Sequence, residues 1–160
     1  MKRIGVISDT HGNSDAIKTC VSEAGKVDAW FHLGDFSADA EELNKLTGLP
    51  VYSVCGNCDY RSSSPEELTV NIEGVKFLLM HGHKYSVAFD DTLRACLRAE
   101  ELECDMLLYG HTHIPELSSY GRIQILNPGS PVRPLGGSKP SFAIVTADNG
   151  TVKAQLIPLC

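Results

Sequence analysis

The sequence has no apolar run of the roughly 20 residues that a membrane-spanning helix requires. Its first residues, MKRIGVISDTHG, are too polar after Ile7 for a secretory signal peptide. Six cysteines are scattered through an otherwise ordinary globular composition, at positions 20, 55, 58, 96, 104 and 160. Without a secretion signal we expect them to be reduced thiols. These absences predict a cytoplasmic protein that does not act in a membrane.

The sequence also lacks an excess of positive charge. Lys and Arg total 14 and Asp and Glu total 20, which gives a formal net charge of -6 and a pI of about 5.4. This balance argues against an extended nucleic-acid footprint. It leaves room for a small phosphorylated substrate, because bound cations can reverse the local field of an acidic protein.

The first third of the chain alternates short apolar runs with helical patterns. Strands are predicted over residues 3–8, 28–33 and 51–55. Helices are predicted over residues 14–25 and 38–48. Ser14 is a plausible N-cap of the first helix, and glycines end both helices. This alternation indicates an α/β fold built on a parallel, doubly wound sheet.

The rest of the chain has a different pattern. A hairpin is predicted over residues 68–80, a helix over 90–103 and a buried strand over 105–109. The last third predicts antiparallel hairpins with turns at Tyr120-Gly121 and Asn149-Gly150. No repeat, linker or charge run divides the 160 residues, so we expect a single domain, residues 1–160.

Polar side chains follow five of the predicted strands, in the segments SDTHG, LGDF, CGNCD, MHGH and YGHTH. In open α/β sheets ligands bind beyond the carboxyl ends of strands, so we expect these loops to meet at one rim. Five of the six histidines of the chain lie in these loops. The rim is expected to present Asp9, His11, Asp35, Asn57, His81, His83, His111 and His113.

The spacing of His111 and His113 limits how the two imidazoles are used. On a helix, residues two apart point roughly opposite ways, whereas in an extended segment they share a face. An extended pair can therefore reach one metal ion or two adjacent ions. A turn that holds two polar residues explains the spacing equally well by itself, and only the joint placement of the five loops favours a site.

The donor set points to metal-ion chemistry. A Ser-His-Asp or Cys-His triad uses one histidine. Four imidazoles, two carboxylates and an amide are too many donors for one tetrahedral zinc ion. Two divalent ions bring more positive charge than two aspartates remove, so such a site attracts an anion such as phosphate. Mostly nitrogen donors favour manganese, nickel, iron or zinc over calcium and magnesium.

Taken in order, these motifs resemble those of the calcineurin-like metallophosphoesterases, in particular the small bacterial and archaeal phosphodiesterase branch. The matching segments are Asp9-Thr10-His11, Gly34-Asp35, Gly56-Asn57-Cys58-Asp59, His81-Gly82 and Gly110-His111-Thr112-His113, with a late NPGS at 127–130. The resemblance implies two facing mixed β-sheets flanked by helices, a four-layer αββα sandwich.

The resemblance also implies a ligand set for two divalent transition-metal ions, with Mn²⁺ or Ni²⁺ ahead of Fe or Zn²⁺. One ion is expected at Asp9, His11, Asp35 and His113, and the other at Asp35, Asn57, His81 and His111. Asp35, Asn57 and His111 are assigned to catalysis, with hydroxide between the two ions as the expected nucleophile.

Cys58 departs from the broader family pattern, in which a histidine that can protonate the leaving group often follows the asparagine. A thiol beside two dications favours thiolate and is a poor proton donor. The segment CGNC also fits a redox C-x-x-C motif, although no clear helix follows it. The identity of the proton donor therefore stays open.

Several other polar residues have two interpretations each. His83 and Arg133 can contact a substrate phosphate, or can be solvated residues of the surface. His32 is expected to pack behind the site rather than to bind metal. Asp59 either orients a ligand or caps a turn, and Asn127 resembles the family's late loop that closes over the metal rim.

These observations favour a metal-dependent phosphodiesterase acting on a small phosphodiester. One alternative is a phosphomonoesterase or nucleotide pyrophosphatase that uses the same ions. Another is a metal-binding interaction scaffold, similar to the retromer-subunit branch of the fold. That branch has lost several ligand positions, whereas this chain retains all of them. Assembly into a homo-oligomer is compatible with the sequence and is not predicted by it.

Overall fold

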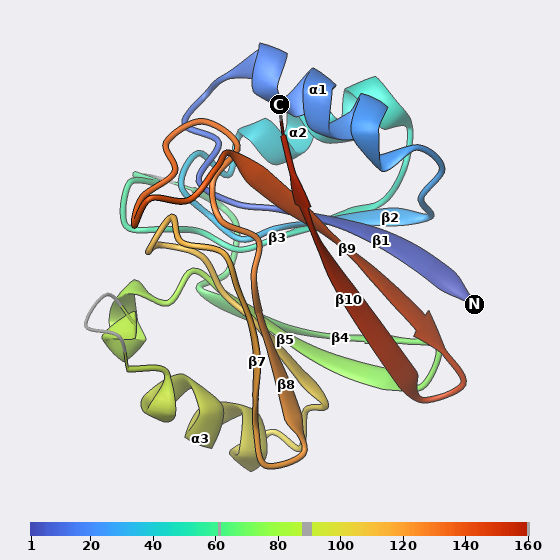
Figure 1. Ribbon diagram of the computed structural model, residues 1–160, viewed down its shortest axis with the longest axis vertical. Helices are drawn as coiled ribbons and strands as arrows, with labels where there is room; N and C mark the ends of the chain where they lie inside the picture. The colour runs from blue at the N-terminus through green and yellow to red at the C-terminus, as the bar shows by residue number, and fades with distance from the viewer. Residues whose placement is uncertain (61, 88–90, 160) are drawn as a thin grey trace.

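The computed structural model describes residues 1–60, 62–87 and 91–159. It contains two five-stranded sheets that face each other (Figure 1). The first sheet has the strand order β10-β9-β1-β2-β3. Its strands are β1 (Lys2–Ile7), β2 (Ala29–His32), β3 (Val51–Ser53), β9 (Ser141–Asp148) and β10 (Thr151–Pro158). The second sheet has the order β4-β5-β6-β8-β7. Its strands are β4 (Glu67–Ile72), β5 (Val75–Met80), β6 (Met106–Leu108), β7 (Glu116–Tyr120) and β8 (Ile123–Asn127).

Both sheets are mixed. In the first sheet β1, β2 and β3 run parallel, β9 pairs antiparallel with β1, and β10 pairs antiparallel with β9 at the edge of the sheet. In the second sheet β5, β6 and β8 are parallel, and the antiparallel strands β4 and β7 form its edges. The expectation of a doubly wound sheet was wrong, because helices cover only one face of the first sheet and the second sheet covers the other.

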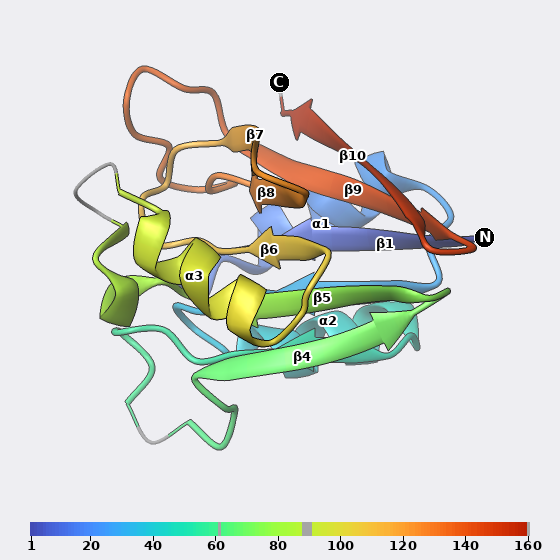
Figure 2. The same ribbon diagram turned by 90° about the horizontal axis from the view of Figure 1, so that it is seen from below.

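Helices form the outer two layers. Helices α1 (Ser14–Ala24) and α2 (Asp39–Thr47) lie outside the first sheet, and α3 (Leu93–Glu101) packs on the outer face of the second (Figures 1 and 2). The four-layer arrangement of helices, two sheets and a helix is thus confirmed. The predicted start of the third helix, residue 90, lies outside the described residues.

The central strands are apolar on both faces because each face has a layer to pack against. Phe31 and Phe77 point into the space between the sheets, with ring centroids 5.4 Å apart in an edge-to-face arrangement. On the outer faces, Trp30 packs with α1 and α2, and Leu78 packs with α3. Burial on both faces explains why these strands read as continuous apolar runs rather than as alternating ones.

Local signals placed most element ends within three residues of where the structure has them, and two local details differ from the prediction. Helix α1 is capped by Asn13, whose side-chain oxygen accepts a hydrogen bond from Ala16 N at 2.9 Å, rather than by Ser14. The turn at Asn149-Gly150 is confirmed, since both residues have positive φ between paired strands. The preceding hairpin turns one residue later than predicted, because Tyr120 pairs with Ile123.

Among the described residues, no helix is both long and apolar enough to cross a membrane.

The contact between the sheets predicts a large effect for one core substitution. Phe77→Ala removes a fully buried ring and leaves a cavity between the sheets, so it should lower the free energy of unfolding by about 3–5 kcal/mol. Leu117→Ala on the edge strand β7 is the matched control, because its side chain is 48% exposed. Urea unfolding followed by circular dichroism measures both. Similar losses for the two variants would mean that this contact does not hold the sheets together.

Candidate metal centre

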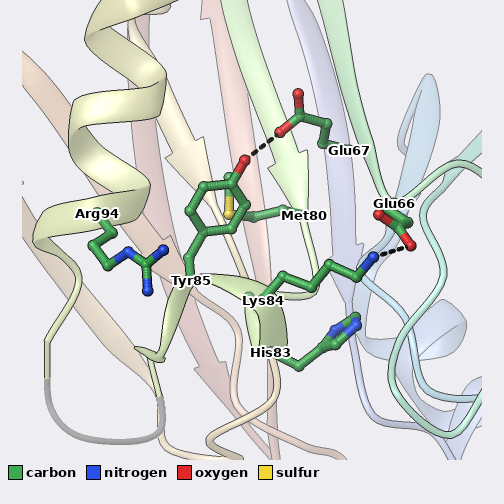
Figure 3. A pocket seen from close by; sticks show the side chains of 8 residues that line it. Glu66, Glu67, Met80, His83, Lys84, Tyr85 and Arg94 are labelled. Atoms are coloured by element: carbon green, nitrogen blue, oxygen red, sulfur yellow. Dashed lines mark hydrogen bonds and ion pairs between the residues drawn. The ribbon is translucent and has the colours of Figure 1, made fainter.

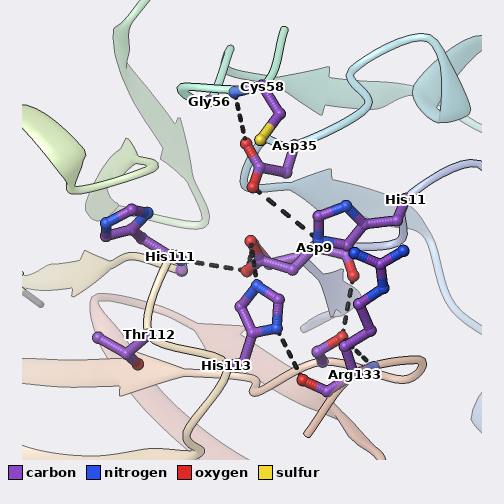
Figure 4. A network of polar contacts seen from close by, with 12 residues as sticks. Asp9, His11, Asp35, Gly56, Cys58, His111, Thr112, His113 and Arg133 are labelled. Carbon is purple, nitrogen blue, oxygen red and sulfur yellow. Dashed lines mark hydrogen bonds and ion pairs between the residues drawn. The ribbon is translucent and has the colours of Figure 1, made fainter. Parts of the chain in front are cut away.

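The five loops expected to form a site meet at one end of the two sheets, beyond β1, β2, β3, β5 and β6 (Figure 4). Asp9, His11, Asp35 and His113 form the first of two groups: one donor atom from each lies within 4.8 Å of the others. The Nε2 atom of His113 is 3.3 Å from Asp9 Oδ1, and His11 Nε2 is 3.9 Å from Asp35 Oδ2. Two carboxylates and two imidazoles at this spacing form a typical site for a divalent ion.

A second group adjoins the first. Asn57 Oδ1 lies 3.0 Å from His81 Nε2 and 3.1 Å from His111 Nδ1, and the two histidine nitrogens are 3.2 Å apart. Asp35 Oδ1 is 3.4 Å from His81 Nε2. The Asp35 carboxylate therefore presents one oxygen to each group.

Two buried atoms in the centre have no hydrogen-bond partner within the described chain: Asp9 Oδ1 and His11 Nε2. His113 approaches Asp9 Oδ1 only outside hydrogen-bonding geometry. A buried polar atom without a partner costs about 1–3 kcal/mol, so such atoms are rare without a functional reason. Coordination of a cation would satisfy both atoms, so the residues present fit a metal ion.

Backbone carbonyls orient two of the imidazoles. His81 Nδ1 lies 2.8 Å from the carbonyl oxygen of Leu33, and His113 Nδ1 lies 2.7 Å from that of Arg133. A carbonyl oxygen can only accept a hydrogen bond, so Nδ1 carries the proton in both rings. The Nε2 lone pair of each ring is then directed into the centre, as metal ligation requires.

The surroundings of several donor residues favour the protonation state that can bind a metal ion, neutral for histidine and ionised for aspartate. Burial lowers the pKa of His11 and of His111, which favours neutral imidazole. Burial acts to raise the pKa of Asp9, but the neighbouring His113 and His81 and the Ser8 hydroxyl outweigh it and hold that pKa below its ordinary value. The contact with Asp9 raises the pKa of His113, so a bound cation would displace a proton there.

The loops have unusual backbone conformations where they carry ligands. Five of the donor residues have positive φ: Asp9, His11, Asp35, His111 and His113. Each such conformation costs of order 1–3 kcal/mol in a residue other than glycine and is typical of functional sites. Hydrogen bonds hold two of these residues, because Asp9 Oδ2 accepts from Ser8 Oγ and His111 N, and Asp35 Oδ1 accepts from Cys58 N.

Two motif glycines allow the loops to approach each other. A Cβ atom on Gly56 would lie 2.3 Å from Asp35 Oδ1, and one on Gly110 would lie 2.1 Å from Ser8 Oγ. Any side chain at Gly56 would therefore displace the carboxylate that faces both groups. These glycines are required for close packing, not for a turn.

Comparison with known proteins agrees with this geometry. Residues 1–150 match the calcineurin-like phosphoesterase superfamily domain. The chain belongs to this family.

The named relatives of this phosphoesterase come from bacteria and archaea. A probable metallophosphoesterase of Methanocaldococcus jannaschii is 36% identical over 162 residues, covering 98% of this chain and 81% of that protein. Phosphodiesterase YfcE of Escherichia coli is 31% identical over 118 residues, covering 68% of this chain and 59% of that protein. The chain is therefore a phosphoesterase of the hydrolase class, and its Asp/His cluster is a candidate site for divalent metal.

Solved structures show the same fold. The crystal structure of a predicted phosphoesterase from Streptococcus pneumoniae has a TM-score of 0.84 and 32% identity, covering 98% of this chain and 89% of that one. Vps29 of Entamoeba histolytica, solved with Zn²⁺, has a TM-score of 0.75 at 22% identity, covering 98% of each chain. The second likeness concerns the fold alone.

Sequence reasoning missed one residue that supports the phosphoesterase site, Asp39. Its Oδ2 accepts hydrogen bonds from Thr10 Oγ1 at 2.5 Å and from Gly12 N at 2.9 Å, which fixes the loop that carries Asp9 and His11. In the sequence Asp39 is only an acidic residue in the first turn of α2, which is common at helix starts. Its position beneath the loop that carries Asp9 and His11 follows only from the fold.

His32 lies in the same buried network and not in either group of donors. Its Nε2 is 2.9 Å from Thr10 Oγ1, and its Nδ1 accepts a hydrogen bond from Gly34 N. The side chain is fully buried, and burial lowers its pKa. His32 thus packs behind the loops, as expected from the sequence.

Asp59 and Asn127 both support loops of the site through hydrogen bonds. The Asp59 carboxylate accepts hydrogen bonds from Gly56 N and Ser37 N, both at 2.6 Å, so it caps a turn instead of orienting a ligand. Asn127 Nδ2 donates to Gly110 O and Thr112 Oγ1, which fixes the loop that carries His111 and His113.

The weaker candidates lie around the two groups of donors. Arg133 lies beside His11, and its carbonyl orients His113 (Figure 4). The His83 ring lies beside the second group, with its centroid 5.4 Å from that of His81 and 6.3 Å from that of His111. Its Nδ1 atom has no hydrogen-bond partner among the described residues. Cys58 is an exposed free thiol beside Asp35, and Cys55 is also free, so the segment serves the third motif loop and forms no disulfide.

Proposed function

We propose that this phosphoesterase is a phosphodiesterase that works with two divalent transition-metal ions. Asp9, His11, Asp35 and His113 would hold one ion, and Asp35, Asn57, His81 and His111 the other. The observation that carries the proposal is the position of Asp35, whose two oxygens face the two groups of donors. Mn²⁺ or Ni²⁺ suits the mainly nitrogen donors best, and Fe or Zn²⁺ also fits.

Two such ions, when bound, polarise a phosphoryl group and acidify water for attack on phosphorus. The chain contributes orientation and exclusion of water from the donors. Asp9 and His81 are fully buried, so the surrounding protein shields their side chains from bulk solvent. Asn57 and His111 complete the catalytic set with Asp35, and Arg133 beside His11 is placed to bind a phosphoryl oxygen.

Hydrolysis of a diester fits the chain better than its alternatives. The relative YfcE is named a phosphodiesterase. A phosphomonoesterase or nucleotide pyrophosphatase would use the same donors, so only rates on matched substrates separate these activities. A scaffold role of the retromer-subunit kind would not require the complete set of donors around Asp35 that this chain retains.

Metal dependence is the first test. Purified protein should hold about two transition-metal ions per chain by elemental analysis, and chelation should abolish hydrolysis of bis(para-nitrophenyl) phosphate. Manganese or nickel should restore the rate better than magnesium, because imidazole is a softer donor than water or carboxylate. Full activity in metal-free buffer would contradict the assignment, and a faster rate on the matched monoester would favour the monoesterase.

Asp35 and His32 should differ in the size of their effects. Asp35→Asn keeps the shape but removes the negative charge between the two groups, so diester hydrolysis should fall by more than 100-fold. His32→Ala removes a buried residue that contacts Thr10 and Gly34 but lies in neither group of donors, so the rate should fall by about 10–100-fold. Rates and bound metal are measured on both variants. If the two variants lost the same amount of activity and of bound metal, Asp35 would not be the residue that serves both groups of donors.

The third prediction concerns the leaving group. A histidine at position 58 can donate a proton to the departing oxygen, which is typically worth about 10²–10⁴-fold. Cys58→His should therefore speed hydrolysis of an alkyl diester by about tenfold or more and leave an activated aryl diester nearly unchanged. The ratio of the two rates cancels changes in metal occupancy. A uniform change in both rates would show that position 58 is not where the leaving group is protonated.

A further inference from the structure

Two cavities open on different sides of the metal centre. The first, here called the His83 pocket, has a volume of about 450 Å³ and is lined by residues that include Glu66, Glu67, Met80, His83, Tyr85 and Arg94 (Figure 3). The second, the Cys58 pocket, has a volume of about 590 Å³ and is lined by residues that include Phe36, Glu41, Cys58, Asp59 and Tyr60. Both volumes fall in the range of small-molecule sites.

Each pocket adjoins the metal centre. The His83 ring centroid is 5.4 Å from that of His81, so the His83 pocket begins beside the second group of donors. In the Cys58 pocket, the Phe36 ring lies 5.8 Å from the His11 ring, and Cys58 N donates to Asp35. A phosphorus atom bound at the centre therefore has one pocket for each of its two organic substituents.

The carboxylates of the His83 pocket already have partners. Glu66 forms an ion pair with Lys84, and Glu67 accepts hydrogen bonds from Tyr85 Oη at 2.8 Å and from the Arg98 guanidinium. Neither carboxylate therefore offers an uncompensated negative charge to a ligand.

Arg94 is different. Within the described part of the chain its guanidinium contacts only Ser86 Oγ, at 3.4 Å, and it extends from α3 toward the Tyr85 ring (Figure 3). On the other side of the pocket, His83 Nδ1 is buried and has no hydrogen-bond partner among the described residues. Met80 and the Tyr85 ring supply apolar surface between them. Among the described residues, the pocket thus combines a cation without an ion-pair partner and a ring nitrogen without a hydrogen-bond partner with apolar walls.

The Cys58 pocket has aromatic walls. Two exposed aromatic rings flank it, Phe36 at 43% and Tyr60 at 87% exposure. Such a lining suits an uncharged, ring-containing group. A diester with one anionic and one aromatic substituent therefore has one preferred orientation.

We propose that the substrate is an unsymmetrical phosphodiester in which one substituent carries its own anionic group, a carboxylate or a phosphate. Resting on the phosphodiesterase function proposed above, this inference places the anionic substituent in the His83 pocket, with its charge at Arg94 and a hydrogen bond to His83. The uncharged substituent occupies the Cys58 pocket and departs. Water oxygen joins phosphorus, the bond from phosphorus to the departing oxygen breaks with its electron pair on that oxygen, and the released proton passes to solvent.

The test compares para-nitrophenyl diesters that share one leaving group. Their second substituents are carboxypropyl, the equally large but neutral carbamoylpropyl, and phosphonopropyl. The metal-loaded protein should show a kcat/KM about tenfold higher for at least one anionic substrate than for the neutral one, because one charge-assisted hydrogen bond is worth about that factor or more. The carboxylate and phosphonate arms identify which anion is preferred.

Arg94→Ala should remove this preference and leave kcat/KM for the neutral diester within about twofold, while Arg94→Lys should restore part of it. Arg122→Ala is the matched control, since it removes one positive charge from an exposed residue that pairs with Asp105. It should keep the preference. Circular dichroism and the neutral-diester rate report on folding of each variant.

The outcomes separate this inference from the function it rests on. Equal rates of the native chain on anionic and neutral diesters would overturn the inference while leaving the phosphodiesterase intact. Equal loss of the preference in Arg94→Ala and Arg122→Ala would also overturn it, since the effect would then be one of net charge. No hydrolysis of any diester by the metal-loaded protein would instead overturn the proposed function.

Discussion

The structure depends on one electrostatic constraint: a carboxylate, Asp35, lies between two groups of candidate metal ligands at the meeting point of five loops. Its side chain is only 3% exposed, and its two oxygens face different groups. Crowded imidazoles and carboxylates are costly here, because the buried atoms Asp9 Oδ1 and His11 Nε2 have no hydrogen-bond partner in the described part of the chain. A bound cation would offset this cost.

The loops around Asp35 adopt backbone conformations of higher energy to bring the donors together. Donor residues take up positive φ, and Gly56 is needed because any side chain would strike the carboxylate. The supporting contacts come from behind, where Asp39 and His32 hold Thr10, and Asn127 holds the last loop. Two apolar-faced sheets provide the rigid base that makes such strained loops sustainable.

Much of the site could be predicted because each of its five motifs is a short continuous segment of the sequence. Each donor directly follows an apolar strand, and the strand pattern alone places the donors at one rim. The doubly wound sheet was wrong because the antiparallel pairing of β9 with β1 joins residues more than 130 positions apart, which no local pattern reveals. Asp39 was missed for a similar reason, since its partners Thr10 and Gly12 are 29 and 27 residues away.

The sequence by itself determined the chemistry of this protein: the donor types, their order and the strands they follow depend on residue identity and local periodicity. Only the tertiary structure decided which donors share a group, that Asp35 faces both groups, and that two pockets lie beside them. These properties depend on distances between segments far apart in the chain. Such distances follow from how two sheets pack across an apolar core, and packing is a property of the whole chain.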